Sequence, residues 1–204
     1  MNTTVTPLWI EKNYDWYLAI IQESSEALDH YGWKWWKKQE PNINQVKIEL
    51  VDIWHFILSA EMNKFSHNYV DGSTLTFNNL DTISANIEAG YDTYKQYVDV
   101  DDFSFINSMK NLVRLATFNS VDYIHFFNAC SKVGLYFDEL FRMYVAKNAL
   151  NIFRQFHGYK TGTYIKNWNG EEDNVYLEKL LDNLDEITYV NIMNKLEEKY
   201  KEII

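Results

Sequence analysis

The chain has 204 residues, a length that suits one domain spanning 1–204. Its 29 acidic and 19 basic residues give a formal net charge of −10, which argues against nucleic-acid binding through a basic surface. The single cysteine, Cys130, excludes an internal disulfide and a multi-cysteine zinc site. The sequence shows no secretory signal and no apolar run of ~20 residues, so the protein is expected in the cytoplasm, without membrane contact. With only 7 Gly and 2 Pro, few residues form turns or break helices, so we predict an all-α fold.

The predicted elements begin with Thr6-Pro7, read as the N-cap and first residue of a helix that runs to Gly32. A turn is expected at Gln39–Asn42 and a break at Asp71–Ser73, between clear helical periodicities. An irregular acidic stretch is expected around Asp99–Asp102. The remaining helices are predicted at 44–64, 79–97, 104–117, 120–132, 137–156, 171–183 and 185–202, with a glycine-containing loop at 157–170.

Two pairs of acidic residues on the first two long helices indicate a cation site. Glu23 and Glu26 are three residues apart, as are Glu49 and Asp52, so each pair shares one helix face. The second pair lies in a run of mostly apolar and aromatic residues, where a carboxylate is costly unless a cation or hydrogen bonds offset its desolvation. Four carboxylates on two antiparallel helices would suit Mg²⁺ or Mn²⁺, and two ordinary solvent-facing pairs are the alternative.

A second segment carries the opposite charge. Residues 140–170 contain no acid, and Lys147, Asn151 and Arg154 form one polar stripe on the helix predicted there. Lys160 and Lys166 follow in the loop. Such a stripe suits a phosphorylated ligand, although an exposed basic face compensating acidic neighbours is an equally good interpretation of the segment alone. Taken with the carboxylates, it indicates a site for metal-bound nucleotide phosphates.

These residues resemble the all-α dimeric dUTPases of the MazG-like nucleoside triphosphate pyrophosphohydrolase superfamily. The resemblance is carried by Glu23-x-x-Glu26, by Glu49-Leu50-Val51-Asp52 and the residues that follow to Ser59, and more specifically by three later blocks, which are 144–155, 158–168 and 172–174. It implies a four-helix metal-binding core with additional helices, a homodimer, and Mg²⁺-dependent hydrolysis of dUTP, and also of dUDP, to dUMP.

The resemblance also implies roles for individual residues. Glu23, Glu26, Glu49 and Asp52 would be the metal ligands and catalytic carboxylates, with one of the first two positioning the attacking water. Phosphate contacts would come from Lys147, Arg154, Tyr159, Lys160 and Lys166. Trp35 and His55 would lie near the uracil and deoxyribose, Asn151 and Asn174 would read the nucleoside, and Asp173 would support these groups or anchor the loop. The loop 157–170 would close over the phosphates.

One feature of the family has no counterpart in the sequence. Family members carry an additional N-terminal helix with a glutamine that helps to recognise uracil, and no matching pattern precedes Glu23. Base selectivity therefore stays open, and a dCTP or broad-specificity dNTP pyrophosphohydrolase is one alternative. A second alternative is a non-catalytic helical interaction protein with the same fold. The sequence does not distinguish a cellular protein from a viral one that acts in the host cytoplasm.

Overall fold

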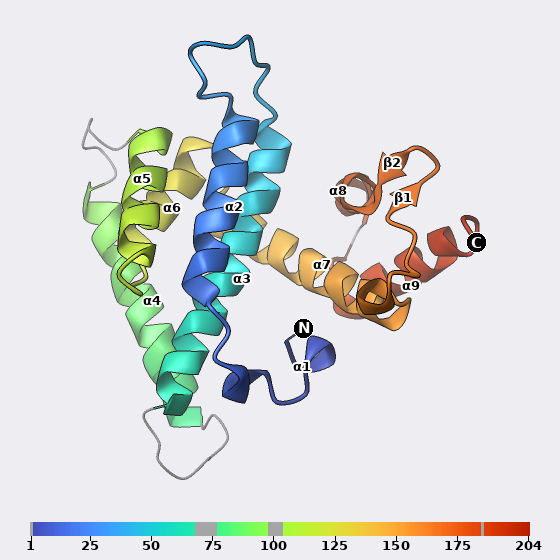
Figure 1. Ribbon diagram of the computed structural model, residues 1–204, viewed down its shortest axis with the longest axis horizontal. Coiled ribbons are helices and arrows are strands. Elements are labelled where there is room, and N and C mark those ends of the chain that lie inside the picture. Colours follow the sequence, from blue (N-terminus) through green and yellow to red (C-terminus); the bar gives the residue numbers. More distant parts are fainter. Residues whose placement is uncertain (1, 68–76, 98–103, 185) are drawn as a thin grey trace. The chain divides into compact units, whose positions relative to one another are not determined.

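The computed structural model describes residues 2–67, 77–97, 104–184 and 186–204, and this part of the chain is all-α apart from one small hairpin (Figure 1). The predicted breaks at Asp71–Ser73 and Asp99–Asp102 fall outside the described residues. No described helix is long and apolar enough to cross a membrane. The α-helices are α1 (Asn2–Val5), α2 (Trp16–Tyr31), α3 (Ile43–His67), α4 (Phe77–Tyr97), α5 (Phe105–Ala116), α6 (Tyr123–Lys132), α7 (Phe137–Phe156), α8 (Asp173–Asn183) and α9 (Tyr189–Tyr200).

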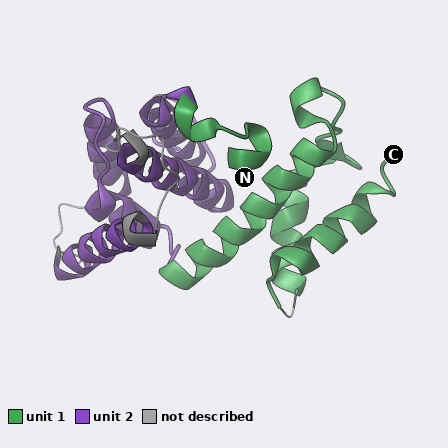
Figure 2. Cartoon of the chain, turned by 90° about the horizontal axis from the view of Figure 1, so that it is seen from below, with its two compact units in different colours: residues 1–11, 137–204 green, residues 12–136 purple. Residues whose placement is uncertain are grey.

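The chain divides into two compact units, coloured separately in Figure 2. Unit 1 comprises residues 1–11 and 137–204, and unit 2 comprises residues 12–136. The expectation of a single domain over 1–204 stays a prediction.

Unit 2 is built around the helix pair α2 and α3, which run antiparallel (Figure 1). Both helices bury one apolar face, and Ile20 and Ala27 of α2 and Leu50 and Ile53 of α3 are almost wholly inaccessible. Such interdigitated apolar side chains supply the main stabilisation of a helical core. The helices α4, α5 and α6 complete the unit, and Trp54 of α3 stacks on Phe126 of α6 with ring centroids 5.1 Å apart.

The first long helix begins later than the sequence pattern predicts. Pro7 does not start it, because the chain forms the short α1 and a 3₁₀ turn at Trp9–Lys12 before α2 begins at Trp16. Asn13 has a positive φ of 48°, which interrupts the helical path, and the side chain of Asp15 then accepts a hydrogen bond from the Leu18 N–H at 2.9 Å. Asp15 is therefore the N-cap that starts α2.

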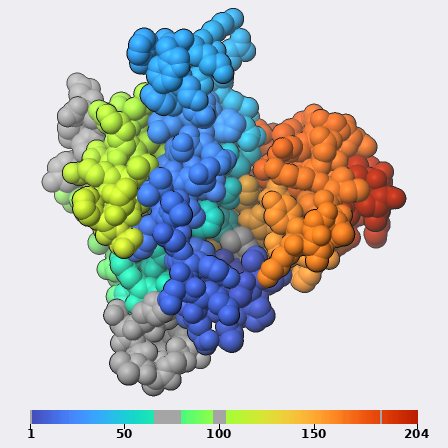
Figure 3. Space-filling view, viewed as in Figure 1, coloured from blue at the N-terminus to red at the C-terminus, as the bar shows by residue number. Residues whose placement is uncertain are grey.

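The connection between α2 and α3 carries the most exposed tryptophans of this unit. Gly32 ends α2 in the left-handed conformation, with φ 78°, as its sequence position predicts. The loop stands out beyond the helix ends in the space-filling view (Figure 3). Trp36 contacts both Trp33 and Trp35 edge to face, and Trp35 is 88% exposed.

Unit 1 has an apolar core of its own, formed by α7, α8 and α9. Phe153, Leu150, Leu196 and Ile192 are fully buried in it, and Tyr200 and Trp168 pack on Phe153. The predicted loop 157–170 contains a 3₁₀ turn at Tyr159–Thr161 and strand β1 (Asn167–Trp168). This strand pairs antiparallel with β2 (Glu171–Glu172), so the helix predicted from 171 begins at Asp173 instead.

Candidate functional site

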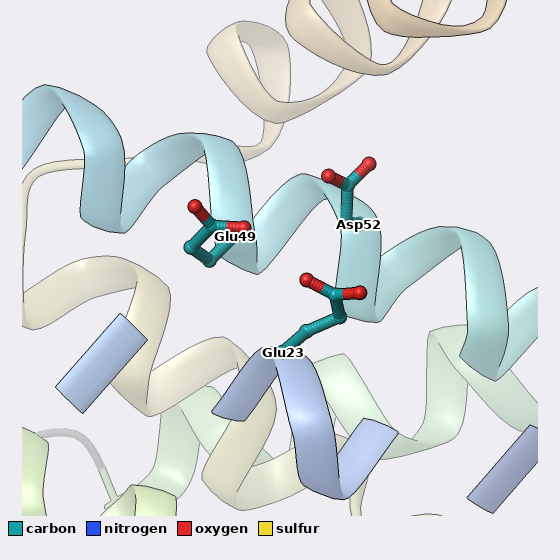
Figure 4. A group of neighbouring side chains, drawn as sticks. All are labelled: Glu23, Glu49 and Asp52. Atoms are coloured by element: carbon teal, nitrogen blue, oxygen red, sulfur yellow. The ribbon is translucent and has the colours of Figure 1, made fainter. Parts of the chain in front are cut away.

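Three of the four predicted metal-binding carboxylates meet between α2 and α3. One carboxylate oxygen from each of Glu23, Glu49 and Asp52 lies within 4.8 Å of the others. Figure 4 shows Glu23 reaching from α2 towards the two carboxylates of α3. The i, i+3 spacing of Glu49 and Asp52 places both on one face of α3. We call these three residues the acidic triad.

Glu49 is the most buried member of the acidic triad, with 7% of its surface exposed. Its Oε1 lies 3.6 Å from Nε2 of His30 near the end of α2. His30 is not among the site residues predicted from the sequence, although it follows Glu23 by seven positions, which places it two turns along the same helix face. A histidine therefore borders the carboxylates on one side.

Glu26, the fourth predicted carboxylate, lies outside this group. Its side chain is exposed, and its Oε1 accepts a hydrogen bond from Nε2 of Gln22 at 2.8 Å. Gln22 is four residues earlier on α2, so the two side chains are neighbours on the helix surface. The role predicted for Glu26 stays a prediction.

The chemistry of the acidic triad suits a hard divalent cation. All three donors are carboxylate oxygens, the ligand type that Mg²⁺ and Mn²⁺ prefer. Three carboxylates held this close repel one another, and Glu49 is also desolvated, so a cation would offset both costs. The residues present therefore fit Mg²⁺ or Mn²⁺, and Glu23, Glu49 and Asp52 would be its protein ligands.

The two predicted nucleoside contacts of unit 2 lie in different surroundings. His55 is one turn beyond Asp52 on α3 and is 4% exposed, with its Nδ1 3.1 Å from the carbonyl oxygen of Val51. Trp35, in contrast, is on the exposed loop after α2.

Cys130 of α6 is buried, as expected for a packing residue, and burial raises the pKa of its thiol.

In unit 1, all three residues of the predicted polar stripe, Lys147, Asn151 and Arg154, are joined in one hydrogen-bonded network. It centres on the Arg154 guanidinium, which donates from Nε and Nη2 to the two carboxylate oxygens of Asp173 at 2.8 and 2.6 Å. Nη1 donates to Asn151 at 3.1 Å. Tyr164 donates its hydroxyl to Asp173 at 2.7 Å. The network, called the Arg154 cluster below, comprises Lys147, Asn151, Arg154, Tyr164, Asp173 and Asn174.

Asn174 completes the cluster from the first turn of α8. Its Oδ1 accepts hydrogen bonds from Nζ of Lys147 at 3.2 Å and from Nη2 of Arg154 at 3.1 Å. The two cations are about two turns apart on the same face of α7, and both reach the same α8 residue. Lys147 and Arg154 are only 6% and 7% exposed, so both are held inside the unit.

Charge and burial shift the protonation equilibria within the Arg154 cluster. Burial alone lowers the pKa of Arg154, but the hydrogen bonds and negative charge of Asp173 outweigh it and raise the pKa above its usual value. Burial first, and then the charge of Asp173, raise the pKa of the Tyr164 phenol. Arg154 therefore stays charged and Tyr164 stays protonated at neutral pH. Tyr164 is not among the site residues predicted from the sequence.

Of the other predicted phosphate contacts, Tyr159 lies against this cluster, and Lys160 and Lys166 have partners outside it. The guanidinium of Arg154 sits 5.7 Å from the ring centroid of Tyr159, in a cation–π arrangement. Lys160 donates to the carbonyl oxygen of Val5 at 3.2 Å, and Lys166 pairs with Glu172 at 2.9 Å. Both lysines are exposed, whereas Arg154 and Lys147 are buried.

An all-α fold with an acidic triad on one helix pair is compatible with a helical hydrolase that uses a divalent cation. A protein-family model described as dUTPase matches residues 1–159. The chain therefore belongs to the all-α dUTPase family, whose enzyme activity is that of a dUTP diphosphatase, and the resemblance noted in the sequence is confirmed. Comparison with curated proteins gives no match. Asp173 and Asn174 lie beyond the matched residues.

Proposed function

We propose that this protein hydrolyses dUTP to dUMP and pyrophosphate with Mg²⁺ or Mn²⁺, and that it also hydrolyses dUDP. The observation that carries the proposal is the convergence of Glu23, Glu49 and Asp52 within 4.8 Å, in a chain of the dUTPase family. Hydrolysis of dUTP in general follows from the family. The metal requirement and the second substrate are the proposed parts.

The acidic triad would hold the cation, and Glu26 is the exposed carboxylate one turn from Glu23 on the same helix. A bound divalent cation would lower the pKa of the water molecule bound to it and would neutralise phosphate charge. Glu23 or Glu26 orients the attacking water and accepts its proton. With attack at the β-phosphorus, a new P–O bond forms in pyrophosphate, the bond from that phosphorus to the α–β bridging oxygen breaks, and this oxygen leaves with dUMP.

The remaining residues bind the substrate. Exposed Lys160 and Lys166 supply mobile positive charge to the phosphates, and the Tyr159 hydroxyl adds a hydrogen bond. Lys147 and Arg154 contribute positive charge to the phosphates from within the buried Arg154 cluster. Trp35 and His55 contact the base and sugar, Asn151 and Asn174 provide amide groups to the nucleoside, and Asp173 keeps Arg154 in place.

We propose that the enzyme is a cytoplasmic homodimer that binds deoxyuridine nucleotides and neither nucleic acid nor membranes. The net charge of −10 disfavours binding to phosphate backbones and anionic lipid. Large apolar side chains are exposed, among them Trp35, Phe118 and Phe141. Apolar surface of this kind is what a partner subunit covers in a helical dimer.

The test is a panel of nucleoside triphosphates incubated with purified protein, with and without Mg²⁺. We expect pyrophosphate from dUTP only when the cation is present, and phosphate from dUDP. In H₂¹⁸O the label is expected in pyrophosphate rather than in dUMP. Equal turnover of dCTP or of all dNTPs would establish the broader pyrophosphohydrolase instead. If the protein neither turns over any nucleotide nor binds Mg²⁺, the non-catalytic alternative would be established.

Paired variants separate the metal site from general damage. Glu49→Gln keeps the size of the side chain but removes its charge, so it should abolish dUTP hydrolysis. Glu40→Gln makes the same change at a side chain that is 89% exposed in the loop before α3, and it should retain wild-type activity. Full activity of Glu49→Gln would overturn the assignment of the acidic triad.

A further inference from the structure

We propose that a cavity beside the start of α2 is a second ligand site, and that it binds an uncharged planar heterocycle such as a nucleobase, free or within a nucleoside. The cavity has a volume of about 570 Å³, and small-molecule sites in proteins usually measure ~300–1,000 Å³. It is lined by residues 13–17, by residues 60, 63 and 64 of α3 and by residue 119, all within unit 2. We call it the Trp16 cavity.

The Trp16 cavity is separate from the acidic triad. It lies at the end of the α2–α3 pair that is remote from the loop carrying Trp35 (Figure 1). Lys64 lines the cavity and follows Asp52 on α3 by twelve residues, a separation of about 18 Å along the axis at ~1.5 Å per residue. The lining residues include neither a member of the acidic triad nor a predicted substrate contact. A small ring compound bound there therefore leaves the acidic triad free to hold its cation.

Two aromatic walls of the Trp16 cavity favour a planar ligand. The rings of Tyr14 and Trp16 have centroids 5.5 Å apart and planes at 88° to each other. A flat ring that stacks on one of them is edge-on to the other, and aromatic rings favour both arrangements. Trp16 also packs against Phe56 of α3, with centroids 6.2 Å apart, so its ring is held in place by the core. Nucleobases stack on aromatic side chains of this kind.

The polar part of the lining suits a ring with several hydrogen-bonding groups. Asn13, Asn63 and Asn119 bring side-chain amides to the cavity from three separate segments of the chain. Each amide offers an acceptor and a donor. Burial raises the pKa of the Tyr17 phenol, which therefore stays protonated and adds an O–H donor at neutral pH. Nucleobases carry carbonyl, ring-nitrogen and amino groups along one edge, and such groups match this set of donors and acceptors.

The charges around the Trp16 cavity disfavour a phosphorylated ligand. Lys64 donates to Oε1 of Glu61 at 2.9 Å, and Glu61 is only 4% exposed. Burial lowers the pKa of Lys64, but the hydrogen bond and charge of Glu61 outweigh it and raise the pKa, so this pair keeps both charges. Asp15 adds a second carboxylate to the lining. The cavity therefore offers no net positive charge to a phosphate group, unlike the Arg154 cluster.

The test is calorimetric titration of the purified protein with adenosine, uridine, adenine and ribose, in the presence of Mg²⁺ and a saturating non-hydrolysable dUTP analogue. The analogue blocks the nucleotide site, so binding that persists belongs to a different place. We expect the nucleosides to bind and ribose, which lacks the planar ring, not to bind. Adenine distinguishes a site for the free base from one that also needs the sugar. Adenosine 5′-monophosphate should bind more weakly than adenosine.

Two variants locate the ligand without disturbing the backbone. Asn13 and Asn119 have positive φ angles of 48° and 54°, which glycine adopts without strain. Asn13→Gly and Asn119→Gly each remove one amide and should weaken nucleoside binding by about fivefold to tenfold, the change that one lost hydrogen bond produces. Asn169→Gly is the matched control, because Asn169 has a φ of 56° but lies in the hairpin of unit 1. Its affinity should equal that of the wild type.

The outcomes separate this site from the catalytic one. Failure of every ring compound to bind, displacement of adenosine by the dUTP analogue, or equal affinity in both cavity variants and the wild type would overturn the proposal. Both cavity variants should hydrolyse dUTP at the wild-type rate. Adenosine binding that depends on Asn13 and Asn119 in a protein without dUTP hydrolysis would count against the proposed function alone.

Discussion

Arg154 and Asp173 form a buried, two-bond ion pair between α7 and α8, with Nε–Oδ2 and Nη2–Oδ1 distances of 2.8 and 2.6 Å. Asp173 is completely inaccessible to solvent. The two hydrogen bonds join α7, which carries Lys147 and Asn151, to the first residue of α8, next to Asn174. The pair therefore holds together both the apolar core of unit 1 and its polar cluster.

Breaking this pair from one side should be strongly destabilising. Asp173→Asn leaves the Arg154 charge buried without its counter-ion, and such changes cost about 3–5 kcal/mol. Urea denaturation followed by circular dichroism measures the loss. Lys179→Ala, which removes an exposed pair with Glu171, should cost under about 1 kcal/mol. A loss for Asp173→Asn no larger than that of the surface control would contradict the prediction.

The Tyr164 phenol makes stability fall in alkaline solution. Burial raises its pKa in the folded protein, whereas in the unfolded chain it ionises near pH ~10. The stabilisation is complete below that pH and is lost above it, because the unfolded state then releases a proton that the folded state retains. Tyr164→Phe should flatten the decline of the unfolding free energy between pH ~9 and ~11, and Tyr189→Phe at an exposed position should not.

Mg²⁺ should raise the melting temperature of the wild type, since binding to the folded state alone stabilises it. Glu49→Gln should abolish this increase. Without the cation, the same variant should be at least as stable as the wild type, because it relieves repulsion within the acidic triad. Glu26→Gln should retain most of the Mg²⁺ effect, since Glu26 lies outside the triad. Loss of the effect in Glu26→Gln would show that the binding group is larger.

Gly90 marks a close approach between α4 and α6. A Cβ atom at this position would lie 2.5 Å from Cβ of Tyr123, an atom next to the backbone that cannot swing away. Gly90→Ala should therefore destabilise the protein by about 1–3 kcal/mol despite the better helix propensity of alanine. Ser84→Ala, on an exposed face of α4, should change the stability by under about 0.5 kcal/mol in thermal or urea unfolding.

Helix periodicity predicted most of the described fold but not every boundary. The helix 137–156 is observed with the predicted limits, since Gly158 in a left-handed conformation follows its end. The first long helix was predicted too early because Thr6-Pro7 is a good start signal by itself. The positive φ of Asn13 and the Asp15 cap, which the prediction passed over, decide where α2 begins.

The candidate site was predictable where spacing along one helix determines the arrangement. Glu49 and Asp52 share a face of α3, and the antiparallel packing of α2 on α3 brings Glu23 opposite them. The partners of Lys147 and Arg154 were not predictable in this way. Asp173 and Asn174 are separated from them by a loop and a hairpin, whose path depends on tertiary packing rather than on local periodicity.

Tyr200 has a consequence for the order in which the protein acquires its two kinds of chemistry during synthesis. Its ring packs on Tyr164, and its hydroxyl accepts a hydrogen bond from the Ile165 N–H at 3.0 Å. The ribosome must therefore pass residue 200 before the segment that holds Asp173 has all its contacts. Residues 12–136 leave the ribosome earlier, so a nascent chain is expected to assemble its acidic triad before its Arg154 cluster.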